Sequence, residues 1–111
     1  MKIIYNNIIP FKGFSCINIC GILFVRKDIT VTNILLNHEN IHTVQMKELW
    51  YVLFYIIYLF EWLIKLIYYR NFKLAYRAIS FEREAYLFEK DYYYLKFYRL
   101  KFASFKYLFL K

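Results

Sequence analysis

Two histidines and a glutamate lie within five consecutive residues and could together bind and use a metal ion. The stretch His38-Glu39-Asn40-Ile41-His42 has the spacing H-E-x-x-H, and its histidines are the only two in the chain. Residues four apart share one face of a helix, so both imidazoles can reach one Zn²⁺. Glu39 follows the first ligand directly and can take a proton from a zinc-bound water. The spacing therefore predicts a zinc site with Glu39 as its general base.

A catalytic zinc site needs a third protein ligand, and the acidic residues after the motif are the candidates. On a helical wheel, Glu82 lies on an apolar face rich in alanine, whereas Glu84 lies about 160° away and is predicted to face solvent. A carboxylate on an apolar face needs a cation as partner. We therefore expect Glu82 to be the third ligand, with Glu89, on the same face, as the alternative.

The same residues also allow a non-catalytic interpretation. The wheel turns His38 and His42 towards the core, where two uncharged histidines could hydrogen-bond to each other or to tyrosines. Glu82 could then pair with an Arg or Lys. Glu61 is followed four residues later by Lys65, a spacing that predicts an internal salt bridge.

Two stretches of the chain resemble gluzincin metallopeptidases. They are NHENIHTVQ, residues 37–45, and SFEREAY, residues 80–86. The second contains E-x-x-A, the start of the E-x-x-A-D motif on which those enzymes often carry their third ligand. The chain is similar in size to the minigluzincins, and its apolar helix is similar to that of membrane gluzincins.

This resemblance implies a role for each matching residue. His38, His42 and Glu82 would bind zinc, Glu39 would be the general base, and the substrate would be a peptide or protein. Tyr86 stands where these families usually have an aspartate that supports the ligands. It lies on the same face as Glu82 and could hydrogen-bond a ligand or an oxyanion instead.

The elements that must position these residues form one expected domain, residues 1–111, of the α+β class and mostly α. Residues 1–12 are predicted to be a strand or arm ending at Pro10. Residues 14–26 are rich in β-branched and aromatic types with Gly21 as a turn, which predicts a short N-terminal β-hairpin. Zinc peptidases of similar build hold an extended substrate on an edge strand there, and a purely structural hairpin is the alternative.

Three helices should follow the hairpin. The first, Thr32 to Lys47, carries the motif, and an apolar helix spans residues 49–69. The third begins near Lys73, bears Glu82 and runs into the low nineties. The basic, aromatic tail is expected to continue as helix.

The two halves of the zinc site lie on either side of the apolar helix in the sequence. A single membrane crossing by residues 49–69 would separate the histidines from Glu82 by about 30 Å. The histidines and Glu82 reach the same height along neighbouring helices only if the chain reverses near residues 47–49 and again near residues 70–71. We therefore predict an up-down-up arrangement. Whether residues 49–69 span a bilayer, lie on it or pack as a hairpin stays open.

The composition limits the classes of protein to consider. The chain has 111 residues, of which 61% are hydrophobic and 24% aromatic, against about 45–50% apolar in ordinary domains. This excludes a disordered or linker-like protein. So small a domain cannot bury all its apolar surface, which favours a membrane, a homo-oligomer or a partner protein.

The charge and cysteine content point to an anionic membrane surface inside the cell. The net charge is +8, and most of it lies in residues 62–111, beside the apolar run. Single-stranded nucleic acid is the alternative anion, but nothing else in the sequence points to it. Cys16 and Cys20 are too far apart in a strand to form a disulfide. Because no signal peptide is recognisable, we expect association with the inner (cytoplasmic) membrane.

Three functions remain at this point. The first is zinc-dependent peptide-bond hydrolysis by a small membrane-associated peptidase. The second is a non-catalytic zinc-binding or structural membrane protein that interacts with other proteins. The third is a basic protein that binds single-stranded nucleic acid.

Overall fold

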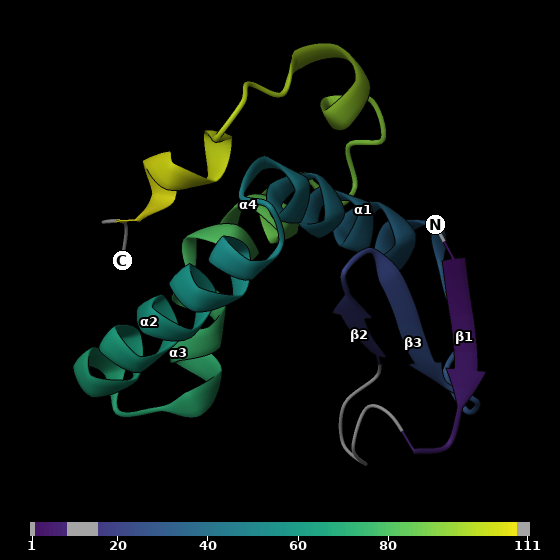
Figure 1. Ribbon diagram of the computed structural model, residues 1–111, viewed down its shortest axis with the longest axis horizontal. Helices are drawn as coiled ribbons and strands as arrows, with labels where there is room; N and C mark the ends of the chain where they lie inside the picture. The colour runs from purple at the N-terminus through teal and green to yellow at the C-terminus, as the bar shows by residue number, and fades with distance from the viewer. Residues whose placement is uncertain (1, 9–15, 109–111) are drawn as a thin grey trace.

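The structure is a computed structural model that describes residues 2–8 and 16–108. A small sheet precedes a larger set of helices, which confirms the expected mostly helical α+β class (Figure 1). The strands are β1 (Lys2–Asn6), β2 (Cys16–Ile19) and β3 (Ile22–Arg26). The helices are α1 (Asn33–Glu48), α2 (Val52–Tyr69), α3 (Phe72–Ala78) and α4 (Ser80–Phe88), followed by a π-helical turn (Tyr94–Tyr98) and a 3₁₀ turn (Ala103–Tyr107).

The sheet contains the predicted hairpin and one strand more. β2 and β3 pair antiparallel and are joined by Cys20 and Gly21, which have φ angles of 51° and 88°. A two-residue turn with both φ angles positive matches the twist of a hairpin. β1 pairs parallel with β3, so the strand order is β1-β3-β2 and β2 is an edge strand. Pro10 and the start of the predicted 14–26 segment lie outside the described residues.

The motif helix α1 begins where the sequence predicts and is fixed against the hairpin. The Thr32 hydroxyl caps it by accepting a hydrogen bond from the Leu35 amide at 3.1 Å. The amide nitrogen of Asn18, on β2, donates to the Glu39 carbonyl and to the Thr43 hydroxyl, both at 3.0 Å. The edge strand therefore lies directly beside the motif.

The chain changes direction near both predicted places, although neither has a proline or glycine. It reverses only at the second, because α2 leads away from α1 at an angle, so the predicted up-down-up arrangement is not observed (Figure 1). After α1, Trp50 and Tyr51 adopt φ angles of 53° and 62°, and the Val52 amide donates to the Trp50 carbonyl at 2.6 Å. This three-residue γ-turn is a rare and strained way to reverse a chain. After α2, Arg70 is left-handed, and Asn71 caps α3 by accepting from the Leu74 amide. As a result α3 runs beside α2 and α4 packs on α1 (Figure 1).

The third helix is not continuous, so the prediction of a single helix into the low nineties is wrong. Ile79 is extended, with φ −60° and ψ 134°, and it separates α3 from α4. The Glu61 carboxylate accepts hydrogen bonds from the Ser80 amide, at 2.8 Å, and from the Ser80 hydroxyl. The Lys65 ammonium donates to the Ala78 carbonyl at 2.9 Å. The predicted Glu61–Lys65 salt bridge is therefore also wrong, because both groups satisfy the backbone at this break.

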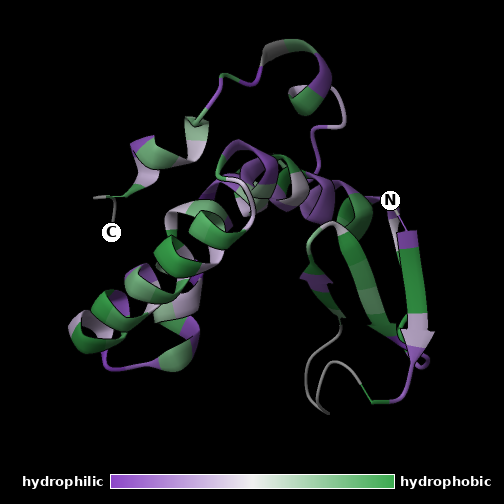
Figure 2. Cartoon of the chain, in the orientation of Figure 1, coloured by the Kyte–Doolittle hydropathy of each residue, from purple (hydrophilic) through white to green (hydrophobic). Residues whose placement is uncertain are grey.

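Two apolar clusters hold the helices together. Buried Met46, Phe54 and Phe81 join α1, α2 and α4 in the first, and buried Ile41, Ala85 and Tyr94 form the second. The tail beyond α4 is not one helix but two short turns, and its 3₁₀ turn packs on α4. Figure 2 shows α2 hydrophobic along most of its length, whereas α1 carries mainly polar residues.

The strained turn after α1 gives a prediction about stability. The Trp50 side chain is 81% exposed, so it contributes little packing, while a left-handed backbone costs a non-glycine residue about 1–2 kcal/mol. We expect Trp50→Gly to raise the free energy of unfolding by about 0.5–1 kcal/mol in urea denaturation, since glycine's own entropy offsets part of the gain. Trp50→Ala keeps the strain and is the control. An equal change in both variants would contradict the argument.

Candidate metal centre

Three ligand-type atoms from two helices meet at one buried point. The Nε2 atoms of His38 and His42 are 3.1 Å apart, and Glu82 Oε1 lies 3.2 Å from the first and 3.1 Å from the second. The three residues are only 4–5% exposed. The tertiary structure thus brings the motif on α1 together with the predicted third ligand on α4.

Hydrogen bonds on the far side of each imidazole fix which nitrogen carries the proton. His38 Nδ1 lies 2.9 Å from Glu89 Oε1, and His42 Nδ1 lies 2.8 Å from Gln45 Oε1. The Gln45 amide nitrogen donates to the Phe81 carbonyl and to a carboxylate of α4, so its oxygen must face His42. Both Nδ1 atoms therefore act as donors, which leaves the Nε2 lone pairs pointing at Glu82.

Three acceptor atoms at such short separations repel one another unless a positive charge lies among them. A proton can supply that charge. Burial by itself would lower the pKa of His42, but the Glu82 carboxylate raises it to about 9. The histidines in turn lower the pKa of the Glu82 carboxyl well below its usual range, against the effect of burial. A metal ion can supply the charge equally well, and the His38, Glu39 and His42 group could bind one.

Glu39 lies near His38 and His42 but not between them and Glu82. One carboxylate oxygen of Glu39 and one ring nitrogen of each histidine lie within 4.8 Å of one another, and Glu39 is 8% exposed. Burial raises the pKa of its carboxyl, although both histidines oppose the shift. A raised pKa moves a carboxylate towards the range in which it works as a base near neutrality.

The edge strand β2 borders the same site. Burial raises the pKa of the Cys16 thiol to about 12, and the Glu39 and Glu82 carboxylates add to this effect. Asn18, two residues further on, binds α1 through its side chain. The inner face of β2 therefore closes the site on the side of Glu39.

Tyr58 on α2 supports Glu82, the predicted third ligand, and sequence reasoning missed it. Its hydroxyl donates to Glu82 Oε2 at 2.7 Å, while Oε1 faces the histidines. Burial and the Glu82 charge raise the pKa of Tyr58, so it stays a hydrogen-bond donor. The sequence feature that could have identified Tyr58 is its position one turn before Glu61, on the same inward face of α2.

Tyr86, which stands where the resembled families usually have an aspartate, packs on His38. Its ring meets the His38 ring edge-on, with centroids 4.5 Å apart, and its hydroxyl lies 3.4 Å from that of Tyr76. The Arg77 guanidinium lies 3.7 Å from the ring centroid. Its observed contact with the site is therefore packing rather than a hydrogen bond to Glu82.

Two of the acidic candidates have roles other than the predicted ones. Glu84 was expected to face solvent, which is wrong, since it is 0% exposed. Arg99 donates to it, as does the Tyr94 hydroxyl at 2.7 Å. The tail folds back over this face of α4, which a wheel of an isolated helix does not show. Glu89 lies at the outer nitrogen of His38 and orients that ligand.

The same network continues to the end of α1. Arg99 also donates to the Glu48 carboxylate at 2.9 Å, and Glu84 accepts from Gln45, the residue that orients His42. A chain of direct hydrogen bonds therefore connects the tail with His42.

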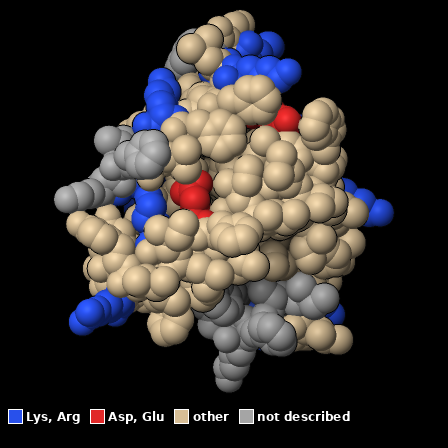
Figure 3. Space-filling model, turned by 60° about the vertical axis from the view of Figure 1, so that its left-hand side comes forward, with Lys and Arg blue, Asp and Glu red and all other residues tan. Residues whose placement is uncertain are grey.

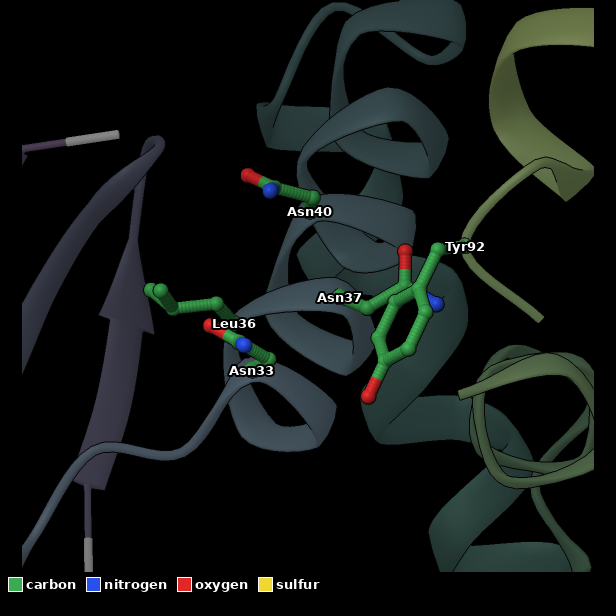
Figure 4. A pocket seen from close by; sticks show the side chains of 5 residues that line it. All are labelled: Asn33, Leu36, Asn37, Asn40 and Tyr92. Atoms are coloured by element: carbon green, nitrogen blue, oxygen red, sulfur yellow. The ribbon is translucent and has the colours of Figure 1, made fainter. Parts of the chain in front are cut away.

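One open pocket lies on the motif helix but away from the candidate metal centre. It has a volume of about 240 Å³ and is lined by Asn33, Leu36, Asn37, Asn40 and Tyr92 (Figure 4). At 100° per residue, the lining residues of α1 lie on the side away from the histidines. The Asn37 amide donates to the carbonyls of Phe88, Glu89 and Asp91. It thereby holds the end of α4 at which Glu89 meets His38.

The buried network gives a prediction that separates it from surface charge. Glu84→Ala would leave the Arg99 guanidinium without its main partner, and breaking a buried pair in this way costs about 3–5 kcal/mol. We expect a loss of that size in the free energy of unfolding. Asp28→Ala, which removes a 74% exposed carboxylate beside Arg26, is the matched control and should change it by less than about 1 kcal/mol. Similar losses in both variants would show that the network does not stabilise the fold.

Comparison with protein families, curated proteins and solved structures gives no match. The resemblance to gluzincins therefore rests on the two sequence stretches alone. The site can be interpreted only from its own geometry.

Proposed function

We propose that this protein is a zinc-dependent peptidase with His38, His42 and Glu82 as the metal ligands. The observation that carries the proposal is the triangle of Nε2, Nε2 and Oε1 atoms with sides of 3.1–3.2 Å. Zinc–ligand bonds of about 2.0–2.2 Å in tetrahedral geometry place ligand atoms about 3.3 Å apart. The three atoms thus fit zinc with little movement.

The kind of ligands favours zinc, and their number leaves room for catalysis. Two imidazoles and one carboxylate are the ligand set of several zinc hydrolases, in which the fourth position holds water. Each ligand is held from behind, His38 by Glu89, His42 by Gln45 and Glu82 by Tyr58. Such support fixes ligand orientation and raises metal affinity.

Glu39 performs the proton transfers in this proposal. Zinc, when bound, polarises the scissile carbonyl and lowers the pKa of a bound water towards about 7. Glu39 accepts the proton of that water and delivers it to the leaving amine. Its burial beside the histidines suits this role, because it raises the pKa of the carboxyl.

The substrate in this proposal is a peptide or protein segment in extended conformation at the edge of β2. An edge strand can add a further strand by backbone hydrogen bonds. The Tyr55 hydroxyl already accepts from the Cys20 amide, at 2.9 Å, and donates to the Asn18 carbonyl, at 3.2 Å. The substrate would therefore pair at the Cys16 end, which is also the end nearer Glu39.

The proposed location is the cytoplasmic side of the inner membrane, at an anionic lipid surface. By length and composition, α2 is apolar enough to cross a membrane, and 11% of it is buried within the protein. A membrane accounts for this exposure together with the basic charge. We do not propose nucleic acid as a partner.

A second candidate function is a non-catalytic zinc site in a structural or interaction protein. It is favoured by the burial of all four site residues, which are 4–8% exposed. Structural zinc sites are closed, whereas catalytic ones keep a position open to water.

The first test is metal content. We expect about one zinc per chain by elemental analysis, with affinity reduced at least about 100-fold in His38→Ala, His42→Ala and Glu82→Ala. Tyr58→Phe should lose about 10–100-fold, because it releases the back of a ligand. Asn40→Ala, on the same helix but away from the site, is the control. Unchanged affinity in the ligand variants would exclude this metal centre.

The second test separates the enzyme from the structural site. Glu39→Gln keeps the size of the side chain but cannot accept a proton, so zinc should stay bound while peptide hydrolysis falls by about 10²–10⁴-fold. Hydrolysis is measured on a library of fluorogenic peptides with zinc-loaded protein. Full activity in the variant would remove Glu39 from the mechanism. Zinc binding without hydrolysis of any peptide by the wild type would favour the structural alternative.

A further inference from the structure

The helix α2 turns its charged side chains inward and its apolar ones outward. Its two charged residues are Glu61, which is 7% exposed and binds Ser80, and Lys65, which binds the carbonyls of Ala78 and Leu108. An ordinary surface helix has the reverse arrangement, with charge towards water. The two charged side chains of α2 therefore have hydrogen-bond partners within the protein.

The opposite side of the helix, here termed the α2 outer face, presents a continuous apolar surface. Its members recur every three or four residues and are 40–78% exposed: Leu53, Ile56, Phe60, Leu63, Ile64 and Ile67. The side of the molecule that carries α2 and α3 shows a broad area without Lys or Arg, which lie mainly towards its rim, and acidic atoms are exposed at a few places within it (Figure 3). A patch of this kind, rimmed by polar groups, marks a membrane or protein contact.

We propose that the α2 outer face inserts into the surface of an anionic bilayer, with the helix axis parallel to the membrane plane. This specifies the surface behind the proposed membrane association and rests on that part of the proposed function, not on hydrolysis. In this arrangement lipid hydrocarbon contacts the α2 outer face, and anionic headgroups contact the two ends of the helix.

The neighbouring helix argues against a crossing. α3 runs alongside α2, and its Lys73 and Arg77 side chains are exposed. A bilayer that surrounded α2 would place these charges next to hydrocarbon, which is costly. Only one side of the α2–α3 pair is free of charge, which is the arrangement of a helix lying in the interface.

The ends of α2 supply the contacts that headgroups prefer. Trp50 is 81% and Tyr68 59% exposed, one near each end, and exposed Lys47 and Arg70 accompany them. Trp and Tyr favour the interface, and each base near an anionic surface adds attraction. About 27 Å of helix therefore lies between two anchoring points.

The same bases disfavour a second copy of the chain as the occupant. Both ends of α2 carry an exposed cation, so helices of two copies packed along their outer faces would bring like charges together in either orientation. Anionic lipid neutralises both ends instead.

The test uses vesicle flotation and the fluorescence of Trp50. Trp62→Phe leaves Trp50 as the single tryptophan. With vesicles of phosphatidylcholine containing about one-third phosphatidylglycerol, we expect flotation, a blue-shifted emission and quenching by brominated lipid. Pure phosphatidylcholine should bind more weakly. The pair Ile56→Gln and Ile64→Gln should lower binding at least about tenfold. Tyr5→Gln with Ile17→Gln, which alters exposed apolar residues of the sheet, is the matched control.

Three results would overturn the proposal. The first is folded protein that does not float with either vesicle. The second is loss of self-association, rather than of flotation, in the Ile56 and Ile64 variant, which would assign the face to a second copy. The third result uses the Lys73→Cys variant, in which Cys16 and Cys20 are also replaced by serine. If vesicle binding protects position 73 from an impermeant maleimide, the helix pair crosses the bilayer.

These results are distinguishable from a failure of the zinc proposal. His38→Ala should float like the wild type, whereas the Ile56 and Ile64 variant should bind zinc with unchanged affinity. Lipid binding by the α2 outer face and zinc binding by the candidate site can therefore be refuted independently.

Discussion

The Glu82 carboxylate uses its two oxygens for two different tasks, and the packing of the helices depends on both. Oε1 faces His38 and His42 on α1, while Oε2 accepts from Tyr58 on α2. A carboxylate that is 4% exposed is stable only when paired in this way. The requirement fixes α4 against α1 and α2 together, and it explains why the chain must turn back between the motif and Glu82.

A second buried charge network ties the tail to the same site. Arg99 joins Glu84 on α4 to Glu48 at the end of α1, and Glu84 holds Gln45, which sets the proton position on His42. The described part of the tail thus supports the candidate metal centre through hydrogen bonds, without itself reaching the two histidines. Because polar networks in a protein interior are costly when only partly satisfied, the tail and the site should be ordered together.

The unusual orientation of α2 follows from the break at Ile79. Ending α3 and starting α4 there leaves backbone groups in need of partners, and Glu61 and Lys65 supply them from α2. With its charges committed inward, α2 has only apolar side chains for its outer side. The same helix therefore completes the core on one face and offers a lipid-compatible surface on the other.

The sequence by itself determined the local features of this protein. It predicted the hairpin, the motif helix to within a residue at each end, the reversal near residues 70–71 and the mostly helical class, because each depends on nearby residues and their periodicity. It also singled out Glu82, since a carboxylate among alanines needs a cation. What it could not give were partners from distant segments: Tyr58 behind Glu82, Arg99 beside Glu84, and β1 beside β3. These were decided only by the tertiary structure, because a helical wheel shows which residues share a face but not which segment covers it.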